Sequence, residues 1–293
     1  MRRTIPYLIA AACMALAAGS APAADDAKDA PLTPIEWKTS LDEAVKAAPD
    51  TTWHLIVDFY TDWCKWCKIA DESTFTDPRV MALTRKFVFA RINAEVDTNT
   101  ARRFGVNGYP TVILLKKGGA EVDRIVGYER PEEFVRIIGD YVKGVGTKAA
   151  LEAQVKLKPQ DMKLKYALAK KHVGRSEFDQ ARSLLQQIIN GDPRNGSGVA
   201  DKASFELAVL HRKERNWYKS IEAFRKFIKA YPKSDLREDA ETYIPWLYAK
   251  AGDTKEALKN YRAFLESNGG SSQADWVKEQ IKILENPSDS SSS

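Results

Sequence analysis

Two cysteines separated by two residues, directly after a run typical of a buried strand, constrain this chain more than any other feature. Cys64 and Cys67 form a C-x-x-C pair and follow the short apolar run from Leu55 to Tyr60. Such a run predicts a strand that is buried on both faces. A helix signal begins at the cysteines, so the pair is expected at the N-terminal end of a helix. The pattern predicts a strand, a turn carrying the cysteines and a helix within an α/β domain.

This position suits thiol–disulfide exchange. The attacking species in that reaction is a thiolate. The free N–H groups and the positive end of the helix dipole would stabilise a thiolate on Cys64, and Lys65 and Lys68 add positive charge nearby. Cys67, one turn further, could then attack the mixed disulfide and release the product. We therefore predict Cys64 as the nucleophile, Cys67 as the resolving thiol, and no cofactor beyond the redox-active disulfide between them.

Three other roles for the pair are weaker. A zinc site needs about four ligands, and only His54, His172 and His211 remain as soft partners, so no metal is expected. A structural disulfide that closes so short a loop would stabilise the fold little. An inert pair in the core is unexpected beside two lysines.

The first 24 residues have the composition of a secretory signal. Arg2 and Arg3 precede an almost wholly apolar run over residues 5–18, and an Ala-Pro-Ala sequence follows. This pattern predicts export and cleavage near Ala23 or Ala24. The apolar run is too short to span a bilayer comfortably.

Cleavage would leave only two of the three cysteines, because Cys13 lies in the signal. A secreted chain with one C-x-x-C pair is not a disulfide scaffold, which would use more cysteines at wider spacing. The formal charge of +5 is small for 293 residues, and basic and acidic residues are interspersed. The composition therefore gives no case for nucleic-acid binding.

Further elements complete the first domain. Ser40 followed by Glu43 is a capping-box pattern that predicts a helix through Ala48. The expected order is helix, strand, helix, strand, helix, strand, strand, helix, which predicts a mixed sheet flanked by helices. Besides the strand before the cysteines, the predicted strands cover residues 87–93, 111–117 and 121–128, and the last helix covers residues 131–142.

Beyond Gly144 and Gly146 the pattern becomes wholly helical and repetitive. Small residues recur at spacings of 39 and 37 (181 to 220 to 257), each followed four residues later by a bulky residue. The units resemble tetratricopeptide repeats, whose period is about 34, so longer loops are expected. The small and bulky residues are Ala181 with Leu185, Ser220 with Phe224, and Ala257 with Tyr261. The predicted organisation is a signal peptide (1–24), a flexible linker (25–34), an α/β domain (35–145), a helical-repeat domain (148–285) and a disordered tail (286–293).

The motifs at residues 57–68 and 108–111 together resemble the thioredoxin superfamily. The segment at residues 72–80 is most similar to the periplasmic C-terminal thioredoxin-like domain of DsbD-type disulfide reductases. The resemblance covers residues from about 36 to 143. It implies a thioredoxin fold and thiol–disulfide oxidoreductase activity, and it places the protein in a bacterial periplasm.

The resemblance also implies roles for residues around the cysteines. Pro110 would be cis, and Tyr109 would lend its backbone to a substrate strand. Asp58 would be a buried acid that exchanges a proton with Cys67, although a solvated and idle Asp58 at the strand edge stays open. Trp63 would pack beneath the loop. The residues expected to bind substrate are Trp63, Lys65, Trp66, Tyr109 and Pro110.

The function predicted from these features is a periplasmic disulfide reductase. Its partners would be disulfide-bearing proteins, a possible membrane electron donor of the DsbD type, and a protein or peptide bound by the repeats. Two alternatives stay open. The same residues could serve an oxidase or isomerase, since the sequence does not decide the direction of electron flow. The chain could also be a repeat-based interaction protein whose thioredoxin-like domain only binds or senses.

Overall fold

The computed structural model describes residues 32–50 and 52–286. The predicted signal peptide, most of the predicted linker and nearly all of the predicted tail lie outside these residues. Within the described part of the chain, no helix is both long and apolar enough to cross a bilayer.

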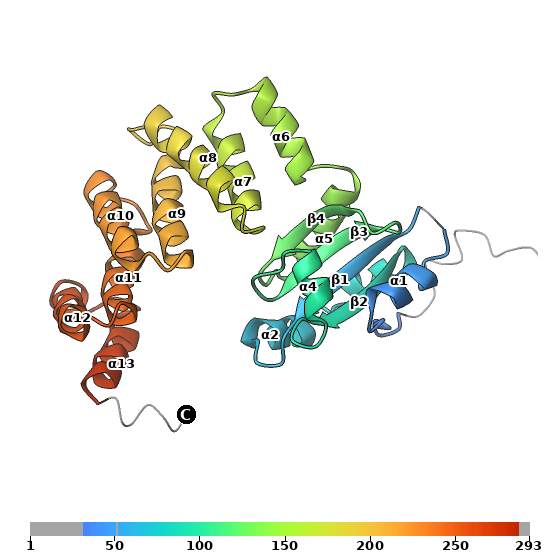
Figure 1. Ribbon diagram of the computed structural model, residues 1–293, viewed down its shortest axis with the longest axis horizontal. Helices are drawn as coiled ribbons and strands as arrows, with labels where there is room; N and C mark the ends of the chain where they lie inside the picture. Colours follow the sequence, from blue (N-terminus) through green and yellow to red (C-terminus); the bar gives the residue numbers. More distant parts are fainter. Residues whose placement is uncertain (1–31, 51, 287–293) are drawn as a thin grey trace, which may run out of the picture.

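A four-stranded mixed sheet forms the centre of the first half of the chain (Figure 1). The strands are β1 (His54–Tyr60), β2 (Phe87–Asn93), β3 (Thr111–Lys116) and β4 (Glu121–Val126). Their order is β2-β1-β3-β4, with β1 and β2 parallel and the other pairs antiparallel. The strand that precedes the cysteines is thus central, and its residues from Leu55 to Phe59 are all buried, as predicted.

Helices cover both faces of this sheet. They are α1 (Leu41–Ala47), α2 (Lys65–Ser73), α3 (Pro78–Met81), α4 (Thr98–Arg103) and α5 (Pro131–Val142), with a short 3₁₀ helix η1 (Ala82–Arg85) after α3. Residues of α1 and α4 pack with Val57 on one face, and residues of α2 and α5 pack with Ile56 on the other. Alternation along β1 places these two neighbours on opposite faces. The predicted α/β architecture, a thioredoxin fold, is confirmed.

Local capping explains where the first helices begin. The Ser40 hydroxyl accepts the N–H of Glu43 at 3.2 Å, as predicted. The Glu43 carboxylate accepts the N–H of Thr39 at 3.0 Å, one residue earlier than in a capping box. The helices α3 and η1 were not predicted. Asp77 caps α3 and Pro78 occupies its first turn, but four residues are too few to show a helical period.

Two strands are shorter than the sequence predicted. The strands expected to reach Lys117 and Tyr128 end at Lys116 and Val126. Gly119 and Gly127, which follow them, have φ values of 81° and 94°. This left-handed backbone, which glycine adopts without a steric penalty, ends the extended conformation.

The second half of the chain is wholly helical among the described residues. Its helices are α6 (Lys148–Leu157), α7 (Met162–Val173), α8 (Phe178–Gly191), α9 (Ala200–Lys213), α10 (Trp217–Ala230), α11 (Arg237–Lys250), α12 (Thr254–Asn268) and α13 (Ala274–Glu285). Each helix packs on the next in the chain. The predicted small and bulky residues are at most 1% exposed, because they fill the contacts between helices.

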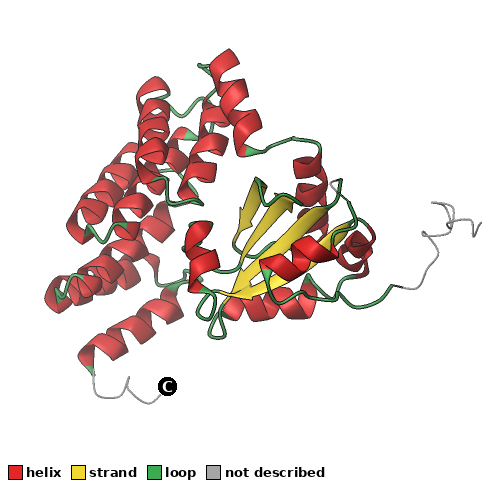
Figure 2. Cartoon of the chain, turned by 45° about the vertical axis from the view of Figure 1, so that its right-hand side comes forward, coloured by secondary structure: helices red, strands yellow, loops and turns green. Residues whose placement is uncertain are grey.

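The repeats bend around one side of the α/β domain in both views (Figures 1 and 2). Figure 1 shows α7, α9 and α11 on the inner side of the bend, toward the α/β domain, and α8, α10 and α12 on the outer side. The helix α2, which begins at the cysteines, lies on the side of the α/β domain that faces the repeats. We call the surface of α7, α9, α11 and α13 that faces the α/β domain the inner face.

Candidate functional site

Cys64 and Cys67 are joined by a disulfide at the start of α2. Cys64 is the N-cap residue of this helix, and its sulfur accepts the N–H of Cys67 at 3.1 Å. Both residues are buried. The predicted placement at a helix N-terminus is therefore present, and the free N–H groups of the first turn point toward the sulfur that would carry the thiolate.

Exposed aromatic side chains flank the disulfide. Trp63 is 67% exposed and Trp66 is 55% exposed. The prediction that Trp63 packs beneath the loop is wrong, because its indole N–H donates to Glu95 at 2.9 Å and holds the ring at the surface. Its edge meets Tyr109, with ring centroids 6.0 Å apart. Trp66 instead stacks on Tyr128 at 5.7 Å.

These contacts form an aromatic platform around the disulfide. The platform consists of Trp63, Trp66, Tyr109 and Tyr128. Lys65 is exposed between the two tryptophans. Large exposed rings beside a reactive pair offer apolar contact area to a polypeptide. Tyr128 was missed from the sequence, since only the bend at Gly127, after β4, brings it beside α2.

Tyr109 and Pro110 are joined by a cis peptide bond, as the resemblance implied. Pro110 is buried and Tyr109 is half-buried. The Pro110 carbonyl accepts the N–H of Gly127 at 2.8 Å, and the Thr111 hydroxyl donates to the Gly108 carbonyl at 2.8 Å. The contact between Tyr109 and Trp63 brings this loop next to the cysteines, 45 positions earlier in the chain (109 − 64).

Asp58 is fully buried in β1, so the solvated position that the sequence left open is wrong. Strand alternation gives it the same sheet face as Ile56, which packs with Ala70 of α2. Asp58 therefore lies under the helix that carries Cys67. Neither of its carboxylate oxygens has a hydrogen-bond partner among the described residues. Burial raises the pKa of Asp58 to about 7, although the nearby Arg91 opposes this effect.

Arg91 is the second residue that the sequence analysis missed. It pairs with Asp58 across the parallel β1–β2 register, and its Nε lies 3.2 Å from an Asp58 oxygen without hydrogen-bond geometry. It also bonds Asp71 of α2 and stacks on Tyr60 at 4.4 Å. One arginine inside an otherwise apolar strand was the available signal, because a buried cation needs an acidic partner.

The described residues contain no cluster of three or more His, Cys, Asp or Glu side chains that could hold a metal ion. His172 contacts Glu177 and His211 lies 3.6 Å from Glu214, so both are engaged within the repeats.

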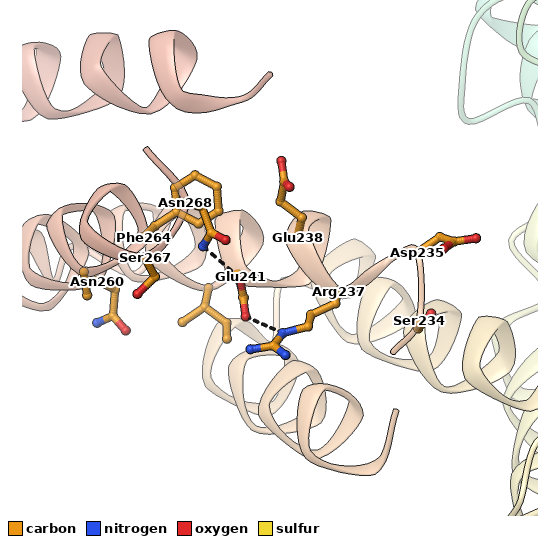
Figure 3. A pocket seen from close by; sticks show the side chains of 11 residues that line it. Ser234, Asp235, Arg237, Glu238, Glu241, Asn260, Phe264, Ser267 and Asn268 are labelled. Atoms are coloured by element: carbon orange, nitrogen blue, oxygen red, sulfur yellow. Dashed lines mark hydrogen bonds and ion pairs between the residues drawn. The ribbon is translucent and has the colours of Figure 1, made fainter. Parts of the chain in front are cut away.

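The repeats contain cavities away from the disulfide. One of about 640 Å³ lies between α11 and α12 (Figure 3). Glu241, which lines it, accepts from Arg237 at 2.8 Å and from Asn268 at 3.3 Å. A second cavity, of about 340 Å³, opens between α9, α11 and α13. Its lining is largely aromatic, and Lys250 lies over the ring of Trp246. Neither cavity holds a reactive sulfur.

Family models match both halves of the chain. A thioredoxin-like domain matches residues 41–141, and a tetratricopeptide repeat matches residues 202–234, which include most of α9 and all of α10.

Individual relatives match the first half. The chain is 36% identical over 121 residues to the thiol:disulfide interchange protein DsbD of Ralstonia nicotianae, a match covering 40% of this chain but only 20% of that relative. It is 32% identical over 117 residues to thioredoxin H2-2 of Oryza sativa subsp. japonica, covering 38% of this chain and 81% of that protein. A solved thioredoxin from Thermus thermophilus is 28% identical, with a TM-score of 0.34, over 37% of this chain and 87% of that one.

The match to most of a complete thioredoxin agrees with the fold and with the placement of the two cysteines at the start of α2. The chain therefore belongs to the thioredoxin family, and it is a thiol–disulfide oxidoreductase with a Cys64–Cys67 pair ahead of tetratricopeptide-like repeats.

Proposed function

We propose that this protein is a periplasmic disulfide reductase whose repeats dock its protein partner. The observation that carries the proposal is the C-x-x-C pair at the N-terminus of α2, above a buried acid whose pKa is raised to about 7. The likeness to a thiol:disulfide interchange protein and the secretory pattern of residues 1–24 support the direction and the location.

The proposed reaction transfers two electrons from the dithiol to a protein disulfide. The Cys64 thiolate attacks one sulfur of the substrate, forms a mixed disulfide and releases the first substrate thiolate. Asp58, as a carboxylate, accepts the proton of Cys67, and the Cys67 thiolate then attacks the Cys64 sulfur. This step closes the Cys64–Cys67 disulfide and releases the second substrate thiolate, so the substrate is reduced and the protein is oxidised.

The raised pKa of Asp58 fits this role. A carboxyl group with an ordinary pKa would be a poor proton acceptor at neutral pH, whereas one near 7 can accept and return a proton. The oxidised protein must then be reduced again by a dithiol. We assign that step to a membrane electron donor of the DsbD type.

Trp63, Lys65, Trp66, Tyr109 and Pro110 are the proposed substrate contacts, and Tyr128 joins them. In the family, an extended substrate segment lies along the loop before the cis-proline. The aromatic platform would pack against its side chains. The aromatic cavity on the inner face would hold another part of the same polypeptide.

The equilibrium reduction potential of the Cys64–Cys67 pair in a glutathione buffer tests the direction. A value of about −270 mV, that of thioredoxin, is expected for a reductant. A value of about −120 mV would make the protein an oxidant of exported chains and would overturn the proposed direction of electron flow.

The Cys64→Ser variant tests the chemistry. It should lose dithiothreitol-dependent reduction of insulin disulfides, because no thiolate is left to start the attack. The exchange Lys143→Ser, at an exposed position at the end of α5, is the matched control and should keep turnover within about threefold. Insulin reduction that survives in Cys64→Ser would show that Cys64 is not the nucleophile and would overturn the proposed reaction.

A further inference from the structure

The contact between the α/β domain and the repeats is built around a buried carboxylate. Asp123 of β4 is 0% exposed. One oxygen accepts from the Arg175 guanidinium at 2.5 Å, and the other lies 3.0 Å from the Lys171 ammonium. The N–H of Lys148, the first residue of α6, adds a bond of 2.7 Å. Among the described residues, the Arg124 N–H is the one group of the α/β domain that bonds this carboxylate, and its other partners lie on the repeat side.

A second layer of contacts surrounds this carboxylate. The Arg175 guanidinium also donates to Glu121 at 2.8 Å. Lys171 donates to the Tyr141 hydroxyl at 2.5 Å and lies 4.3 Å from the centre of its ring. Asn107 of the α/β domain donates to Ser176 at 3.0 Å. Several elements of the α/β domain thus meet the same short segment, the end of α7 and the turn after it.

The shapes of the two surfaces also match. A Cβ atom placed on Gly174 would lie only 3.2 Å from the Val126 side chain, so the absence of a side chain there lets the end of α7 approach β4 closely. The close fit and the buried ion pairs favour one orientation of the repeats relative to the α/β domain. Any other orientation would leave Asp123, Lys171 and Arg175 without these partners. We call this contact, formed by Asp123, Lys171, Arg175 and Gly174, the Asp123 latch.

The latch acts on the whole repeat stack. It holds α7, and α7 is packed through α8 and α9 to the rest of the stack. Fixing α7 therefore fixes the inner face, including its aromatic cavity between α9, α11 and α13. Without the latch, the connection from Val142 to Lys148 would remain, and its Gly144 and Gly146 have φ values of 73° and 64°. Two such glycines give a connection little stiffness of its own.

We infer that the Asp123 latch is a positioning device for polypeptide substrates, which holds the inner face at one place relative to Cys64. This inference rests on the proposed function. A polypeptide bound on the inner face would then present its disulfide to Cys64 at a high effective concentration. A small disulfide that does not reach the repeats would gain nothing. The latch residues are positioning residues, because none touches the disulfide.

The experiment compares two probes on variants of the full chain. Scrambled ribonuclease A serves as the polypeptide disulfide and 5,5′-dithiobis(2-nitrobenzoate) as the small one. Lys171→Met with Arg175→Leu removes both cations. The first variant leaves Asp123 buried without a cation and could fold poorly for that reason. A second variant therefore adds Asp123→Asn, which removes the unpaired charge. Arg182→Leu is the matched control, since it breaks a 2.5 Å ion pair with Glu214 inside the repeats.

We expect both latch variants to raise KM for scrambled ribonuclease about tenfold and to leave kcat and small-disulfide turnover within about twofold. Small-angle X-ray scattering should show a larger radius of gyration, while circular dichroism confirms that both domains stay folded. Arg182→Leu should match the wild type on both probes.

If the latch variants have a larger radius of gyration but an unchanged KM for scrambled ribonuclease, the inference is overturned. An unchanged radius of gyration in these variants would overturn it as well. A wild-type protein that reduces neither probe would instead overturn the proposed function, and the positioning role would fall with it. The wild-type rates therefore distinguish the two failures.

Discussion

Asp58 in β1 and Asp123 in β4 are both fully buried in one sheet, yet their surroundings shift their pKa values in opposite directions. Asp58 has no hydrogen-bond partner among the described residues, and burial raises its pKa to about 7. Burial also acts to raise the pKa of Asp123, but the hydrogen bond from Arg175 and the charge of Lys171 outweigh it, and the net pKa is lowered.

The difference lies in the partners. Arg91 approaches Asp58 without hydrogen-bond geometry, so one cation only partly offsets the loss of water. Asp123 accepts bonds from a guanidinium and two backbone N–H groups. Burial alone therefore does not set the charge of an aspartate. Asp58, which lacks hydrogen-bond partners within the described part of the chain, can accept and release a proton. Asp123, which is fully hydrogen-bonded, stays ionised and connects the two domains.

The largest expected effect is on the pH dependence of stability at Asp58. Its native pKa of about 7 exceeds its ordinary value of 3.8. The native state thus keeps a proton that the unfolded chain releases, and stability falls as pH rises from about 4 to about 7, by roughly 4 kcal/mol. Asp58→Asn should remove this fall and be more stable than the wild type at pH 8. Urea unfolding of both oxidised proteins at pH 4.5 and pH 8 measures the difference. Parallel pH curves would contradict the raised pKa.

Asp123→Asn should change stability in the opposite direction and destabilise the protein near neutral pH. At pH 7 the exchange leaves Lys171 and Arg175 without their anion, at a cost of about 3 kcal/mol. Because the native pKa of Asp123 is lowered, the wild type keeps this stability above the ordinary pKa and loses it as pH falls through the native value. The gap between the proteins should therefore close in acid.

Asp140→Asn is the control for this exchange, since that carboxylate pairs with Arg136 on the exposed side of α5. It should cost less than about 1 kcal/mol. Equal losses for Asp123→Asn and Asp140→Asn in urea unfolding would mean that the latch adds no stability beyond that of a surface pair.

Exchanges at the same two aspartates should also differ in their effect on the turnover rate. Asp58→Asn should slow insulin reduction at pH 7 about 100-fold, the low end of what a positioned base contributes. Asp123→Asn should leave turnover of a small disulfide within about twofold, because it lies outside the reacting site. Steady-state rates with dithiothreitol as the reductant measure both. A full rate in Asp58→Asn would show that Cys67 loses its proton by another route.

The smallest expected effect concerns Arg91. Its charge lowers the pKa of Asp58 against the effect of burial. Arg91→Met should therefore shift the acid limb of the pH–rate profile upward by about one unit, while Arg91→Lys keeps the charge and shifts it less. A downward shift in Arg91→Met would mean that Arg91 acts on another group.

Much of this molecule could be predicted from local patterns. The buried strand, the helix that begins at the cysteines and the small and bulky residues of the repeats all appear as predicted, because their spacing alone sets which side chains share a face. The short helix after Asp77 was missed because one turn has no period. Trp63 was misplaced because its position depends on Glu95, which follows β2.

The sequence by itself determined a thiol pair at a helix N-terminus and a repeat stack, since both follow from residues within one or two turns of each other. Only the tertiary structure decided which charges meet. Arg91 reaches Asp58 through the parallel register of β1 and β2, and Arg175 reaches Asp123 across 52 residues through the packing of two domains. Electrostatic partners depend on distance in space, which local sequence does not contain. The states of the two buried aspartates were therefore settled by the fold.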